Sequence, residues 1–105
     1  MGVSIQGTLP IPIVVNGVAL DAVTMVAKTT EESFADTLSV KGDQYVHVMK
    51  LACQTRFGHD DDTGTVMTYD QLWTTSDQNY DYLQSLKVRL QEKERNAVKL
   101  ASTQI

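Results

Sequence analysis

The chain has 105 residues, which is enough for one compact domain and too few for two ordinary ones. Its 13 acidic and 9 basic residues give a net charge of -4, which argues against a protein that binds nucleic acid through clustered Lys and Arg. The first 20 residues carry no charged side chain, but they contain two prolines and an Asn-Gly pair and lack the basic start of a signal peptide. We therefore expect a cytoplasmic protein without a membrane span.

Few residues could carry chemistry. The single cysteine, Cys53, excludes an intramolecular disulfide, and one thiol with two histidines is too few ligands for a structural zinc site. Cys53 falls on the apolar arc of a predicted helix, which favours a core role over a nucleophilic one. No phosphate-binding, dinucleotide-binding or nucleophile-elbow motif occurs. The sequence thus predicts no catalytic residue, no cofactor and no bound metal.

His59 and the three aspartates at 60–62 form the one cluster that suggests a metal ion. Counted as a calcium loop from Asp60, the sixth position is Thr65 where Gly is required, and the twelfth is Gln71 where Glu is required. We interpret this segment as a solvated loop. A small metal-dependent enzyme using it is the less favoured alternative.

Two β-rich runs, 9–15 and 18–27, flank Asn16-Gly17, the pair that best tolerates a type I′ turn. Such a turn pairs Val15 with Val18, and it pairs the residues two and four positions further out in the same way. The expected core face is Ile11, Ile13, Val15, Val18 and Leu20. In this register Pro10 and Pro12 occupy positions where no ladder hydrogen bond is lost.

Four helices are expected after the hairpin. Thr29 and Glu32 have capping-box spacing, which predicts a short helix to about Leu38. A second helix over 43–57, ended by Gly58, carries Val46, Met49, Cys53 and Phe57 on one side and His47, Lys50 and Gln54 on the other, and we expect it to be the central packing element. After a brief extended stretch at 65–67, Thr68 with Gln71 and the Met67–Leu72 staple predict a third helix, and Ser76 or Asp77 begins a last, longer one.

These elements predict an α+β fold in which an N-terminal β-hairpin packs on a small bundle of three to four helices. Residues 1–90 form the domain, and 91–105 form a charged helical extension or a flexible tail. From Lys87 onward the chain has five basic and two acidic residues, so an acidic body precedes a mildly basic tail.

Aromatic and leucine residues in the last third are the candidate interaction surface. Large aromatic side chains are enriched at protein interfaces, and leucines at spacings of three and four share one face of a helix. Either the core of this domain or a partner must cover that face. The predicted protein-interaction residues are Tyr69, Trp73, Tyr82, Leu83, Leu86 and Leu90.

The segment from Leu9 to Leu20, Val23-Thr24-Met25, and Asp81-Tyr82-Leu83-Gln84-Ser85-Leu86 resemble the opening hairpin and the last helix of the small tail-assembly chaperones of long-tailed bacteriophages. The resemblance covers roughly residues 9 to 90. It implies a non-enzymatic protein in the host cytoplasm that holds the tape-measure protein soluble during tail-tube assembly and is absent from the finished tail. The implied partners are the tape-measure protein and, secondly, the tail-tube protein, with no nucleic acid or membrane, and a homo-oligomer is left open. A structural tail or connector component that stays in the particle is the alternative.

Overall fold

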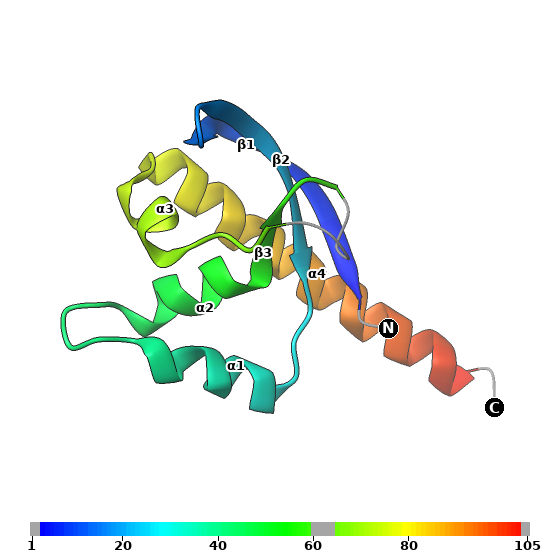
Figure 1. Cartoon of the computed structure of the whole chain (residues 1–105). Helices are drawn as coiled ribbons and strands as arrows, with labels where there is room; N and C mark the ends of the chain where they lie inside the picture. The colour runs from blue at the N-terminus through cyan, green and yellow to red at the C-terminus, as the bar shows by residue number, and fades with distance from the viewer. Residues whose placement is uncertain (1–2, 60–64, 104–105) are drawn as a thin grey trace.

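The computed structural model describes residues 3–59 and 65–103. They form an α+β fold with a three-stranded antiparallel sheet, ordered β1-β2-β3, and four α-helices (Figure 1). The elements are β1 (Ser4–Val15), β2 (Val18–Val26), α1 (Thr30–Asp36), the 3-10 turn η1 (Thr37–Ser39), α2 (Val46–Gln54), β3 (Thr55–Phe57), α3 (Tyr69–Thr74) and α4 (Asp77–Thr103). The predicted fold class is thus confirmed, with a third strand added to the hairpin.

The hairpin turn is as predicted. Asn16 and Gly17 have φ angles of 52° and 80°, the left-handed values that a type I′ turn needs. Val15 pairs with Val18, and Ile13 pairs with Leu20. Turn chemistry is local, and it fixes the register for the first residues on either side.

Further from the turn the predicted register is wrong. Ala22 pairs with Thr8 and not with Ile11, so residues 9–12 of β1 bulge away from the ladder. The bulge turns Leu9 into the core and leaves Ile11 38% exposed. Val18 at the turn is also exposed, whereas Val23 and Met25 are completely buried. The two prolines lie in this bulge, where their missing N–H groups cost no ladder hydrogen bonds.

Side chains of α4 form hydrogen bonds with backbone groups that are left without a strand partner in the bulge and at the outer edge of β1. The Asn79 side chain is fully buried and bonds the Ile11 backbone twice, accepting from its N–H at 3.0 Å and donating to its carbonyl at 2.7 Å. The Thr8 N–H donates to the Tyr82 hydroxyl at 3.0 Å. Gly7 permits this approach, since a Cβ there would lie 2.3 Å from that hydroxyl oxygen.

The middle of the chain differs from the single helix expected over 43–57. Tyr45 precedes α2 without a side-chain cap, and the helix ends at Gln54. Thr55 to Phe57 then pair with β2 as β3, and the hydroxyl of Thr55 donates to the Leu51 carbonyl at the end of the helix. Gln54, expected on the polar side, is buried and donates to the Val26 carbonyl.

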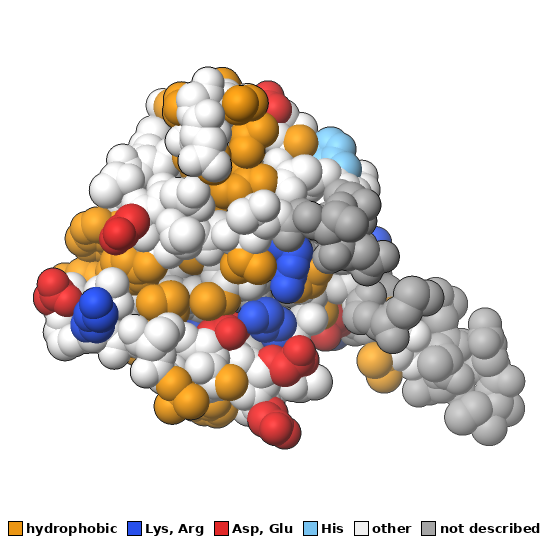
Figure 2. All heavy atoms as spheres, in the orientation of Figure 1, with side chains coloured by type: hydrophobic (Ala, Val, Ile, Leu, Met, Phe, Trp, Pro, Cys, Tyr) orange, Lys and Arg blue, Asp and Glu red, His pale blue; other side chains and the backbone are white. Residues whose placement is uncertain are grey.

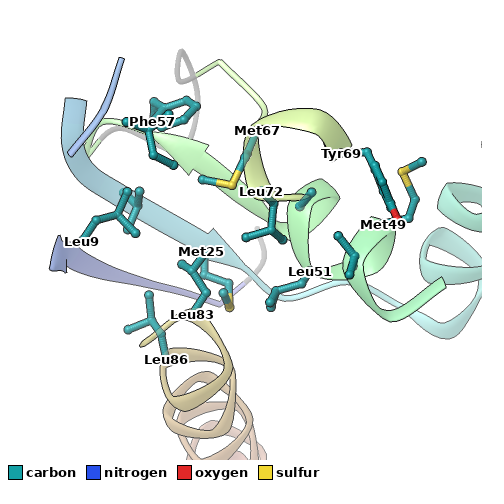
Figure 3. Packing of buried hydrophobic residues seen from close by; sticks show 14 of the residues in the cluster. Leu9, Met25, Met49, Leu51, Phe57, Met67, Tyr69, Leu72, Leu83 and Leu86 are labelled. Atoms are coloured by element: carbon teal, nitrogen blue, oxygen red, sulfur yellow. The ribbon is translucent and has the colours of Figure 1, made fainter. Parts of the chain in front are cut away.

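Two helices build the core: α2, the predicted central packing element, buries Val48, Met49, Leu51 and Ala52, and α4 covers the sheet. Figure 3 shows Leu83 and Leu86 pointing toward the sheet residues Leu9 and Met25. Leu90 is also buried in this cluster. Helix α4 packs mainly on β1, whereas α2 contacts α3, α1 and β3.

Both predicted capping boxes are present, at Thr29 with Glu32 and at Thr68 with Gln71. Ser76 accepts a hydrogen bond from the Gln78 N–H at the start of α4. This helix continues without a break to Thr103, and the Lys93 ammonium donates to the Ser4 carbonyl. No helix in the described part of the chain is both long enough and apolar enough to cross a bilayer.

Candidate protein-docking groove

A groove of about 520 Å³ opens where α2, α3 and the first turns of α4 meet. Its wall is mostly apolar and aromatic, with one carboxylate at its edge. The lining residues are Tyr45, His47, Val48, Leu72, Trp73, Thr75, Asp77 and Tyr80. Figure 2 shows hydrophobic side chains gathered over α2 and α3 on one face of the molecule.

Three stacked aromatic rings form one side of the groove. The ring of Trp73 lies 5.4 Å from that of Tyr45 and 5.9 Å from that of Tyr69, with interplanar angles of 25° and 23°. Tyr69 is buried, and its hydroxyl accepts a hydrogen bond from the Tyr45 N–H at 2.9 Å. Offset stacking of this kind fixes ring orientation. Trp73, still 53% exposed, is therefore held in place at the surface.

The local sequence explains why Trp73 is presented in this way. The capping box of Thr68 fixes the start of α3, and the buried Met67 and Leu72 anchor the helix on both sides of that cap. Trp73 follows Leu72 directly, so on a helix it points about 100° away from the buried face. A six-residue helix thereby displays one large ring beside the groove.

A second hollow, of about 240 Å³, continues the groove along α4. The two hollows share His47, an exposed residue of α2. The second is lined by His47, Leu51, Gln84, Lys87, Val88 and Gln91. Burial lowers the pKa of the Lys87 ammonium below its usual range, and the neighbouring Lys50 lowers it further.

The predicted interaction residues divide into two groups. Trp73 is at the groove, and Tyr69 supports it from beneath. In contrast, Leu83, Leu86 and Leu90 are buried by the sheet, so no partner can reach them in this fold, and we correct that part of the prediction. Tyr82 is half-buried, and its hydroxyl is used by β1. The leucine stripe was visible in the sequence, but what covers it depends on tertiary structure.

Tyr45 was not among the predicted interaction residues, although it is 61% exposed and stacks on Trp73. Its spacing of three from Val48 and seven from Ala52 is typical of the apolar arc of a helix. The residue lies one position before α2 begins, so its side chain does not follow the helical face. Only the stacking with a residue 28 positions away reveals its role.

Cys53 and His59, the other candidate functional residues, make contacts within the fold. Cys53 is half-buried, and burial, together with the nearby Asp36 carboxylate, raises the pKa of its thiol. The His59 imidazole lies 3.1 Å from the Gly7 carbonyl oxygen, and the His59 carbonyl accepts from Gln6. The aspartates at 60–62 lie outside the described residues, so the solvated-loop interpretation and its metal-site alternative stay predictions.

No known family, curated protein or solved structure matches the chain. The groove is therefore interpreted from its own geometry. Its features are an apolar wall, a fixed aromatic stack and a run of polar side chains along α4. This composition fits the docking of a protein segment, because interfaces combine aromatic anchors with a polar rim.

Proposed function

We propose that this protein is a non-enzymatic tail-assembly chaperone, which uses the groove around Tyr45 and Trp73 to bind an apolar helical segment of the tape-measure protein. The observation that carries the proposal is the fixed, half-exposed Trp73 ring beside an apolar groove. An exposed aromatic ring that is already ordered loses little conformational entropy on binding. The resemblance of the hairpin and the last helix to such chaperones supplies the identity of the partner.

The shape and charge of the molecule support a role in holding an apolar partner. A groove between helices suits an amphipathic helix, whose apolar side chains enter at positions three and four apart. The net charge of -4 favours solubility while that apolar surface is exposed. A chaperone requires both properties at once, because its partner is prone to aggregate before assembly.

Co-expression with the tape-measure protein tests the proposal directly. The full chain is expected to keep that protein in the soluble fraction and to co-purify with it. Trp73→Ala is expected to weaken the complex by about tenfold or more, as for a central aromatic anchor. Phe34→Ala is the matched control, because Phe34 is an aromatic residue on α1 that is even more exposed than Trp73 and lies away from the groove.

Three results would contradict the proposal. If the unmodified chain neither keeps the tape-measure protein in the soluble fraction nor co-purifies with it, the chaperone function is wrong. If the chain is found in finished tails, it is a structural component instead. Equal weakening by Trp73→Ala and Phe34→Ala would show that binding occurs elsewhere on the surface.

A further inference from the structure

The two hollows share His47 and lie along α2 and α4, and together we call them the channel. On α4, five of its lining residues recur every three or four positions and so share one face: Asp77, Tyr80, Gln84, Lys87 and Gln91. On the opposite side, α2 contributes His47, Val48 and Leu51. From Asp77 to Lys87 the channel follows α4 for ten residues, or about 15 Å. This length suits two to three turns of a docked helix.

The Lys87 end of this channel has an excess of positive charge. Lys87 lines the second hollow and is half-buried, and burial, together with the charge of Lys50, lowers the pKa of its ammonium. Among the described residues no carboxylate lies within 4.0 Å of either ammonium, and the one ion pair found there, Lys28 with Asp36, is elsewhere. A half-buried cation beside a like charge is unfavourable unless an anion joins it. The channel therefore lacks a negative group at this end.

We propose that the channel takes an amphipathic helix of a partner protein that carries an Asp or Glu side chain opposite Lys87. This inference rests on the proposed function and specifies the chemistry of the partner segment. Apolar side chains of the helix contact Tyr45, Trp73 and Tyr80, and its carboxylate lies about two turns further along α4, at the Lys87 ammonium. A helix gains further binding free energy from the apolar wall of the groove, which a free inorganic anion at Lys87 does not contact.

Selection from a displayed peptide library tests this chemistry without assuming the tape-measure protein. The library consists of helical peptides of about 18 residues, roughly 27 Å long, with leucines fixed at one face and all other positions varied. The full chain is the bait. Selected peptides are expected to share one acidic position, and changing that residue to its amide is expected to weaken binding about tenfold.

Variants of the chain test whether the acidic residue of the peptide contacts Lys87. With Lys87→Met the change from acid to amide is expected to alter binding less than twofold. Lys99→Met is the matched control, since Lys99 is exposed on the same helix outside the channel. Lys87→Met is also expected to raise the melting temperature by about 2 °C, because it removes a half-buried charge. A gain in thermal stability excludes unfolding as the cause of weaker binding.

Three outcomes would overturn the inference. The first is a set of selected peptides without any acidic preference. The second is an acid-to-amide change that weakens binding equally with and without Lys87. Self-association of the unmodified chain that Trp73→Ala and Lys87→Met abolish would assign the channel to a second copy. Failure of the proposed function gives a different pattern, in which acidic peptides are selected but the tape-measure protein is not retained.

Discussion

Helices α1 and α3 both begin with a capping box, but they differ in how far they are buried. Each starts after a Thr whose hydroxyl accepts from the third helical N–H, while the third residue bonds back to the Thr backbone. Yet α3 buries Tyr69 and Leu72, whereas α1 buries no residue and leaves Phe34 67% exposed. A capping box therefore fixes where a helix begins, and the apolar residues that follow decide whether it joins the core.

The largest expected effect comes from removing the side chain that anchors α3. Leu72→Ala should lower the free energy of unfolding by about 3 kcal/mol, because Leu72 is only 3% exposed and the substitution leaves a cavity. Phe34→Ala on α1 should change it by less than about 0.5 kcal/mol. Urea unfolding followed by circular dichroism measures both values. Similar losses for the two variants would show that α1 is packed as firmly as α3.

A smaller difference is expected from removing the caps themselves. Thr68→Ala should cost about 1 to 2 kcal/mol, since α3 cannot shift its start without displacing Met67 and Leu72. Thr29→Ala should melt α1 locally and lower global stability by less than about 0.5 kcal/mol. Amide hydrogen exchange resolves the two cases, because local melting speeds exchange in α1 alone. Global loss of protection in the Thr29 variant would contradict the comparison.

The smallest expected effect is a dependence of α1 on pH. Hydrogen bonds from the Thr29 backbone and side chain lower the pKa of the Glu32 carboxyl. Its contribution to α1 is therefore complete above the unfolded pKa of about 4.5 and is lost as the pH falls through the lower folded value. Gln71 holds the equivalent position in α3 and does not titrate. Helical NMR shifts in α1 should weaken below pH 4.5 before those of α3, and Glu32→Gln should remove this difference.

The sequence predicted the features that depend on neighbours in the chain. The Asn16-Gly17 turn and both capping boxes form because their partners lie within a few residues. The bulge at 9–12 was missed because it forms around Asn79, a residue 68 positions from Ile11. Strand β3 was missed because its apolar Phe57 continues the helical spacing of α2, and only pairing with Val23 decides the matter.

The same limit applies to the candidate site. Trp73 and Tyr69 were predicted from the cluster of aromatic residues in the last third of the chain. Tyr45 lines the groove, and Lys87 lines the second hollow, only because the fold brings α2 and α4 side by side. The leucines at 83, 86 and 90 form a stripe that either a partner or the core could cover. Covering by β1 and β2 is a property of the folded chain and has no local signature.

The contacts between α4 and the free edge of β1 have a consequence for protein synthesis. Tyr82 and Lys93 bond the outward backbone groups of Thr8 and Ser4, which would otherwise offer a template for another strand. A ribosome makes the hairpin first and needs roughly 3 to 13 seconds to add the residues up to Lys93 at about 5 to 20 residues per second. During that interval the edge is uncovered. Pro10 and Pro12 lie on this strand and have no N–H group to donate to an incoming strand. They therefore disfavour pairing of the nascent hairpin with neighbouring chains until the last helix has been made.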